Sequence, residues 1–270
     1  MPRPASISIR LIEDRLGVWL EKQPVAVARP AESAPVRRDM ATLLAFVRDE
    51  KVVGTQGTGN MPLKAVAEVS ARFVNPPPLE ATIGNRTYRI RSEEELWPLY
   101  FLHILADVGG LIQSGSARRW RLTANGERFL DAQPVLQVAF LLAVWWYRVN
   151  WLVAYSYTGM GNALPDGFQQ TTLVTLRSLP AGTDISFDEF ADKLIDETGL
   201  TWGAKNSSVA TIALRSSIHR MVISMLDTFG VLNCRYTKEK RGQSEVSKVV
   251  AFKVTPLGNA LLDALVALES

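Results

Sequence analysis

The chain has 270 residues, of which 47% are hydrophobic and 21% charged, and its net charge is +3. This composition is typical of a folded protein with one or two domains and excludes a disordered chain. One cysteine and two histidines exclude a disulfide framework and a cysteine-rich zinc site, so we expect no metal and no other cofactor. The first ten residues, MPRPASISIR, do not resemble a secretory signal, and we expect a cytoplasmic protein.

The region 1–38 shows no strong structural pattern. Its second half, QPVAVARPAESAPVRR, contains repeated prolines separated by small residues. Proline interrupts helices and strands, so the sequence predicts an N-terminal segment followed by a linker up to residue 38.

The region 39–134 contains three predicted helices. RRDMATLLAFVRDE carries apolar residues at helical spacing, and GTGNMPLKAVAEVSARF offers Asn60 as an N-cap with Pro62 in the first turn. The third helix lies in RSEEELWPLYFLHILADVGG, where Ser92 and Glu95 have the spacing of a capping box. Pro98 favours either a start near Trp97 or a kink.

A long apolar stretch follows, VLQVAFLLAVWWYRVNWLVAYSY at 135–157. Its length is that of a membrane span, but Arg148 and Asn150 would lie inside the bilayer at a cost of several kcal/mol. We therefore predict no membrane span and a buried helix at 135–160 that joins two halves of the protein.

The region 161–270 repeats the order of the first half. TTLVTLRSLP and ISFDEFADKLIDETG are predicted helices, and Ser186 with Glu189 forms a second capping box. SSVATIALRSSIHRMVISMLDTFG, residues 207–230, is a third predicted helix.

Two phrases of the sequence are near-copies, WRLTANGERFLDA at 120–132 and FKVTPLGNALLDA at 252–264. Thr123 and Thr255 suit the N-cap of a closing helix in each copy. The preceding LADVGGLIQ and LDTFGVLNC also align, with Leu105, Gly109 and Leu111 against Leu226, Gly230 and Leu232. Each copy predicts a helix end, a glycine, a hairpin and a closing helix. The sequence therefore predicts a mainly α fold with small β-hairpin wings, in which two tandem winged-helix units are joined by the long apolar helix.

The phrases LTANGERFL and VTPLGNALL resemble the ending of bacterial winged-helix regulators related to the multiple-antibiotic-resistance repressors. Residues 40–130 are also similar to the helical region of the Ri-plasmid open-reading-frame-three family. That second similarity is carried mainly by Thr58, Gly59, Asn60, Leu63 and Lys64. The first resemblance implies a winged-helix fold, and the second implies no established activity.

The second hairpin is the strongest candidate for function. By this alignment it is 11 residues longer than the first, and residues 234–253 carry six basic and two acidic residues, a local net charge of +4. Such a loop suits a phosphate backbone, although a solvated hairpin whose charges prevent edge aggregation is the alternative. The third helix of the second half would read bases, unless its polar face is only a solvated surface. The candidate nucleic-acid-binding residues are Arg235, Lys238, Lys240, Arg241, Lys248, Arg215, Arg220, Arg118 and Arg119.

These patterns favour a non-enzymatic DNA-binding protein, either a regulator or an accessory of a mobile element. The alternative is a protein-interaction or scaffolding module that docks a partner or a second copy through its apolar helices. The sequence shows no catalytic set of residues, and a membrane partner is not expected.

Overall fold

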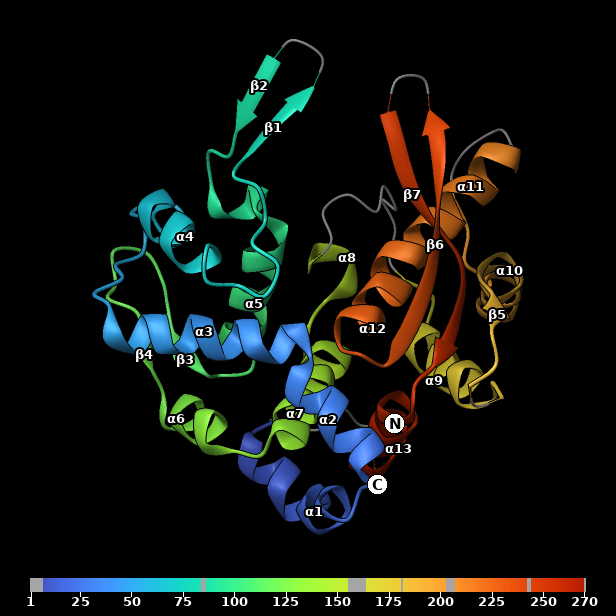
Figure 1. Ribbon diagram of the computed structural model, residues 1–270, viewed down its shortest axis with the longest axis horizontal. Coiled ribbons are helices and arrows are strands. Elements are labelled where there is room, and N and C mark those ends of the chain that lie inside the picture. The colour runs from blue at the N-terminus through green and yellow to red at the C-terminus, as the bar shows by residue number, and fades with distance from the viewer. Residues whose placement is uncertain are drawn as a thin grey trace. The chain divides into compact units, whose positions relative to one another are not determined.

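A computed structural model describes residues 7–83, 86–154, 164–180, 182–202, 207–241 and 244–269 (Figure 1). The described chain is mainly helical with small antiparallel hairpins, which confirms the predicted fold class at that level. It divides into two compact units. Unit 1 comprises Ala31–Val149 and the segment that ends at Lys22, and unit 2 comprises Gln23–Pro30 and Asn150–Leu268.

The N-terminal region, in which the prolines indicated a linker up to residue 38, is helical. Helix α1 spans Ile9–Glu21, α2 spans Val25–Ser33, and α3 begins at Pro35. Alanine-rich sequence favours a helix, and burial of Val27 and Ala31 adds to that preference. Together they outweigh the proline inside α2.

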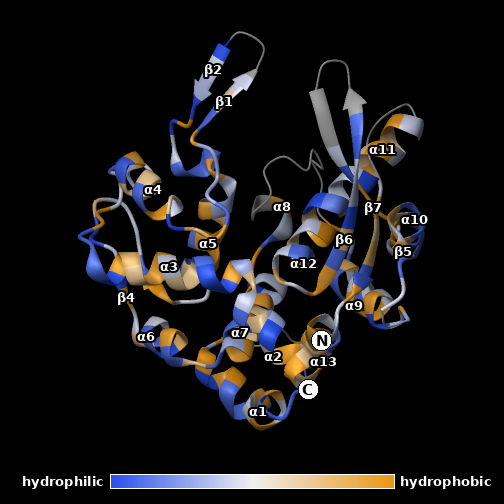
Figure 2. Cartoon of the chain, viewed as in Figure 1, coloured by the Kyte–Doolittle hydropathy of each residue, from blue (hydrophilic) through white to orange (hydrophobic). Residues whose placement is uncertain are grey.

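Unit 1 continues with a series of short elements. They are α3 (Pro35–Asp49), α4 (Leu63–Ser70), β1 (Glu80–Ile83), β2 (Arg86–Arg89), the 3-10 turn η1 (Glu93–Glu95), α5 (Trp97–Val108), β3 (Ile112–Gln113), β4 (Arg121–Leu122), α6 (Ala124–Asp131) and α7 (Pro134–Arg148). The hairpin β1–β2 was not predicted. Figure 2 shows hydrophilic residues along β2, whose four side chains are all exposed. A strand without a buried face has no apolar alternation to reveal it.

Two predicted helix caps in unit 1 are replaced by other contacts. The N-cap of α4 is Pro62. The side-chain amide of Asn60 donates instead to Glu94 at 3.1 Å. Ser92 makes no side-chain cap, while Glu95 accepts from the backbone amide of Arg91 at 2.9 Å. The predicted start of α5 near Trp97 is confirmed.

The apolar stretch forms a buried helix that is shorter than predicted. Helix α7 packs against α1, α3 and α5 within unit 1, and it ends at Arg148. A separate short helix, α8 (Trp151–Ala154), begins where Asn150 Oδ1 accepts from the Leu152 amide at 3.0 Å. Residues 155–160 of the predicted bridging helix lie outside the described part of the chain.

Unit 2 contains a second helical series and a longer hairpin. Its further elements are α9 (Phe168–Arg177), β5 (Ile185–Ser186), α10 (Phe187–Thr198), α11 (Ser207–Ile218), the π turn η2 (His219–Ile223), α12 (Ser224–Thr228), β6 (Leu232–Arg241), β7 (Ser244–Val254) and α13 (Pro256–Glu269). The elements α11, η2 and α12 follow one another without a break, in agreement with the predicted third helix. Ser186 caps α10 by accepting from the Glu189 amide, as predicted.

Among the described helices, one stretch is long and apolar enough to cross a membrane. It is Ser208–Thr228, and 44% of its most apolar part is buried within the protein. Its buried residues include Met221, Val222 and Ile223, which form core contacts at the π turn. A soluble protein is consistent with this packing.

A threonine closes the hairpin of unit 1. Thr123 Oγ1 donates to the Gly110 carbonyl at 2.6 Å and accepts from the Gly126 amide at 3.0 Å. It therefore ties the end of the third helix, α5, to the first turn of the closing helix, α6.

The same hydrogen-bonded frame recurs in unit 2. Thr255 Oγ1 donates to the Gly230 carbonyl at 2.7 Å and accepts from the Gly258 amide at 2.8 Å. The predicted capping role of both threonines is confirmed, and each copy of the repeated phrase marks the same structural junction.

The frame corrects the predicted alignment of the two copies by one residue. Gly230 corresponds to Gly110 rather than Gly109, because both have a left-handed backbone, with φ of 73° and 62°. Both amides donate 2.9 Å bonds to the carbonyl of an aspartate, Asp227 or Asp107. The glycine and the threonine are 13 positions apart in unit 1 and 25 in unit 2, so the second hairpin is longer by 12 residues, not 11.

A third extended segment lies beside each hairpin. In unit 2, β5 pairs with β7, which gives the sheet order β5-β7-β6. In unit 1, Val53 forms an isolated antiparallel bridge with Arg119, flanked by a 2.9 Å bond from the Trp120 amide to the Val52 carbonyl. In unit 2 the second strand of the hairpin is thus paired on both sides. In unit 1 the additional pairing lies in the residues that lead into β4.

Gly126→Ala and Gly258→Ala should each destabilise the protein. A Cβ at either position would overlap the carbonyl oxygen of Leu111 or Val231, and the backbone cannot move away cheaply. We expect a loss of about 1–3 kcal/mol for each substitution, measured by denaturant unfolding. Gly17→Ala is the control, because it lies in α1 with open space around it and should stabilise by up to about 1 kcal/mol. Equal stabilities for all three variants would contradict the frame.

Candidate nucleic-acid interface

The hairpin β6–β7 of unit 2 is a long antiparallel ribbon with a buried base. Val249, Ala251 and Phe252 are buried, and the register shifts at a bulge between Arg235 and Tyr236. A bulge increases the local twist of a ribbon and redirects the side chains beyond it.

Contacts to the third helix anchor the base of this hairpin. Tyr236 Oη donates to Asp227 Oδ2 at 3.2 Å, and burial raises the pKa of the Asp227 carboxyl. Burial also raises the pKa of the Cys234 thiol to about 12, so this cysteine is not a reactive thiolate at neutral pH. The buried side chains at the base of the hairpin are therefore structural, and its exposed side chains are the groups open to a ligand.

The predicted cations near the base of the hairpin lie close to carboxylates. Arg235 is exposed and lies 3.6 Å from Asp184, while exposed Lys248 lies 3.9 Å from Glu239. These pairs are solvent-exposed, so they contribute little to stability and leave the cations accessible.

The predicted cations of the hairpin do not form one cluster. Thr237 is opposite Lys248 in the register, and exposed Lys238 follows it, so Lys238 and Lys248 point to opposite faces of the ribbon. The side chains of Lys240 and Arg241 lie outside the described part of the structure.

The third helix of unit 2 does not present both of its predicted arginines. Arg215 binds Asp192 on α10 with bonds of 2.8 and 2.6 Å, and it lies 3.4 Å from Asp188. The bond to Asp192 raises the pKa of the Arg215 guanidinium, which is held between two carboxylates. Arg220, by contrast, is exposed.

The start of this helix is more apolar than its sequence pattern predicted. The first part of α11 exposes two apolar side chains, Val209 (51%) and Ile212 (65%). Lys205 and Asn206, at the start of the predicted polar face, lie outside the described residues. The described start of α11 therefore presents these two apolar side chains beside exposed Ser208 and Thr211.

The third helix of unit 1, α5, is part of the core, as its apolar sequence predicts. Leu99 and Leu102 are buried. The first hairpin does expose Arg118 and Arg119, together with Arg121 on β4. The two units therefore present basic residues from their sheets more than from their third helices.

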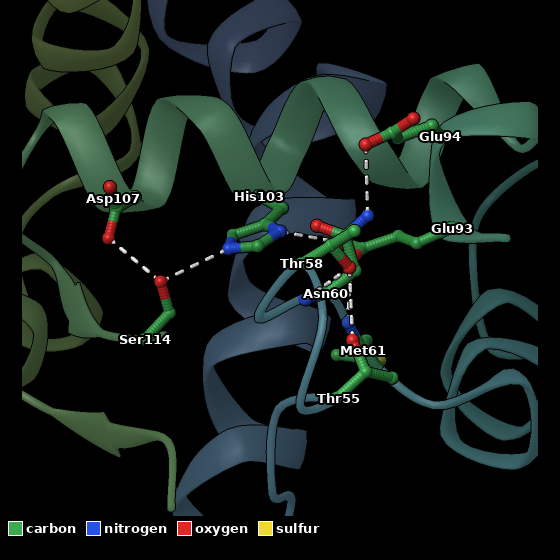
Figure 3. Close-up of polar contacts among 9 residues, drawn as sticks. All are labelled: Thr55, Thr58, Asn60, Met61, Glu93, Glu94, His103, Asp107 and Ser114. Atoms are coloured by element: carbon green, nitrogen blue, oxygen red, sulfur yellow. Dashed lines mark hydrogen bonds and ion pairs between the residues drawn. The ribbon is translucent and has the colours of Figure 1, made fainter. Parts of the chain in front are cut away.

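A buried polar network in unit 1 was not predicted (Figure 3). Fully buried Glu93 accepts from the Met61 amide at 2.6 Å and lies 2.9 Å from His103 Nδ1. His103 Nε2 lies 3.2 Å from Ser114 Oγ, which donates to Asp107 at 2.9 Å.

Ser114, His103 and Glu93 have the connectivity of a catalytic triad, but their hydrogen bonds favour a structural role. The single hydroxyl proton of Ser114 goes to Asp107, so His103 does not receive it as a general base would. Asp107 also has a counterpart in unit 2, where Asp227 hydrogen-bonds Cys234. This shared contact belongs to the repeated frame, and only the correct alignment of the two aspartates reveals it.

Comparison with models of protein families, with curated protein sequences and with solved structures finds no match. The resemblances seen in the sequence therefore stay predictions, and function has to be argued from the geometry.

Glu93→Gln should destabilise unit 1. The glutamine retains the size of the side chain, but it has one acceptor oxygen instead of two, so either the Met61 amide or His103 Nδ1 loses its oxygen partner. Since hydrogen bonds to a buried charged group contribute about 1.5–3 kcal/mol, we expect a loss in that range by chemical denaturation. The control is Glu94→Gln, an exposed neighbour with a side-chain bond to Asn60, which should change stability little. An equal effect of both substitutions would rule out the network as a stabilising feature.

Proposed function

We propose that the chain is a non-enzymatic protein that binds duplex DNA through phosphate contacts of the β6–β7 hairpin. The observation that carries the proposal is an anchored ribbon with exposed Arg235, Lys238 and Lys248. Each cation that neutralises a phosphate releases condensed counterions, which favours binding at moderate salt. The carboxylates near Arg235 and Lys248 are half-exposed and distant enough for phosphates to compete with them.

The proposal includes a tandem winged-helix organisation. Both units have the order helix, extended segment, two helices, hairpin and closing helix, with β1–β2 as an insertion in unit 1. Both also close with the same threonine frame. In helix-turn-helix docking one helix enters the major groove, and a wing beside that helix reaches the phosphate backbone.

Sequence-tolerant binding is the expected mode. Arg215 is occupied by Asp192 and Asp188, so this helix offers base edges one arginine fewer than its sequence predicts. Contacts to phosphates position a protein but carry little sequence information. Binding of this kind suits a cytoplasmic accessory of mobile DNA better than a regulator with a defined target sequence.

Val209 and Ile212 favour a second candidate function. They lie three residues apart on one side of α11 and are more than half exposed. A scaffolding module that docks a protein partner on α11 would use this surface, and the hairpin would then have no role in binding.

Replacing Arg235, Lys238 and Lys248 by alanine should weaken DNA binding and its dependence on salt. The slope of log K against log salt changes by about 0.9 for each phosphate contact, so the triple variant should lose up to about 2.7. Fluorescence anisotropy with a duplex of about 30 base pairs and arbitrary sequence, in a series of salt concentrations, measures this slope. Lys193→Ala is the control, because that lysine is exposed but lies on α10 rather than on the hairpin.

An unchanged slope in the triple variant would contradict the role of the hairpin. Absence of DNA binding by the unmodified protein at low salt would contradict the proposed function and favour the scaffolding alternative.

A further inference from the structure

The hairpin β3–β4 of unit 1, together with the segment around Val53 that pairs beside it, carries basic residues on its outer face. The bridge pairs Val53 with Arg119, and β3–β4 pairs Gln113 with Arg121. Arg119 lies in the extended segment that leads into β4, two residues before Arg121, so the two arginines share a face. Lys51 precedes Val53 by two residues, so the same alternation places it on that face too.

Burial confirms this alternation. Val52 and Trp120, the residues between these positions, are buried at 4% and 1% exposure, while Lys51, Arg119 and Arg121 are exposed. We call these three cations the unit-1 basic face.

The unit-1 basic face has no acidic partner in the described part of the chain. Some other exposed cations of unit 1 do, since Arg48 lies 3.0 Å from Asp49, and Arg91 also lies beside a glutamate. No carboxylate lies within 4.0 Å of Lys51, Arg119 or Arg121 among the described residues. Three neighbouring cations repel one another, and an anion on this face would relieve that repulsion.

The segment that carries Lys51 is also held firmly in place. The Gly54 amide donates to the Arg118 carbonyl at 2.9 Å, and Ser116 Oγ donates to the Gln56 carbonyl. The far end of the same loop is fixed by the bond from the Met61 amide to Glu93 (Figure 3). A face that is already ordered loses little entropy when it binds a ligand.

The corresponding part of unit 2 is different. The bridge of Val53 with Arg119 aligns with the pairing of Ser186 with Ala251, so Arg119 corresponds to an alanine. By the same alignment Lys51 corresponds to Asp184, the carboxylate near Arg235. Of the three positions, only that of Arg121 has a basic counterpart in unit 2. In unit 2 the exposed cations Arg235, Lys238 and Lys248 lie instead on the hairpin β6–β7.

We propose that the unit-1 basic face is a second phosphate-binding surface for duplex DNA. This inference rests on the proposed function, because it assigns to the same ligand a contact that the hairpin does not make. The two arginines present planar donors that match phosphate oxygens, and the lysine adds a point charge.

The test compares two triple variants of the full chain with the same DNA duplex. Replacing Lys51, Arg119 and Arg121 by alanine should reduce the salt slope by up to about 2.7 and weaken binding at least about tenfold at roughly 0.1 M salt. The hairpin variant should have its own, separate effect, and combining the two sets should reduce the slope further.

A matched control replaces three other cations of unit 1 that lie near carboxylates, Arg48, Lys64 and Arg91. It changes the net charge by the same amount, so a smaller effect on the slope assigns the loss to the unit-1 basic face. Thermal unfolding followed by circular dichroism shows whether each variant is folded.

The outcomes separate this inference from the proposed function. If only the hairpin variant changes the slope, the unit-1 basic face is not a DNA surface and the hairpin proposal stands. If only the unit-1 variant changes the slope, the hairpin proposal fails and this inference stands. If the unmodified protein binds polyglutamate through this face but no DNA, both fail and the face is a site for an acidic protein.

Discussion

The structure of both units depends on one threonine hydroxyl that makes two bonds. It donates to the carbonyl of a left-handed glycine after the third helix and accepts from the first turn of the closing helix. The glycine of that first turn, Gly126 or Gly258, then lies against the backbone carbonyl of Leu111 or Val231. The geometry leaves no room for a side chain, so the start and the end of each hairpin are fixed relative to each other. A fixed base allows the rest of the hairpin to differ. The second hairpin has 12 more residues between glycine and threonine than the first. Its first two residue pairs nevertheless keep the register of the corresponding pairs in β3–β4.

The sequence predicted the features that depend on local patterns. Apolar spacing predicted α3, α9 and α10, and the Thr-x-x-Gly phrases predicted the caps that the hydrogen bonds show. Pairing Gly109 with Gly230 was wrong because adjacent glycines are indistinguishable as letters, and only the backbone angle separates them.

Other features could not be predicted because they depend on tertiary contacts. The burial of Glu93 depends on its bond to the backbone of Met61, 32 residues earlier in the chain. The ion pairs of Arg215 depend on how α10 packs beside α11. Likewise, Lys51 joins the unit-1 basic face only because its segment pairs with the residues that lead into β4, far along the chain.

We propose that DNA contacts the hairpin β6–β7 and the unit-1 basic face. Acetylation of lysines, read by mass spectrometry with and without duplex DNA, tests it most directly. The account predicts that DNA protects Lys51, Lys238 and Lys248, while Lys64 and Lys193, which lie near glutamates on helices, react equally in both states. Equal reactivity of all five lysines, or protection of Lys64 and Lys193 alone, would contradict it.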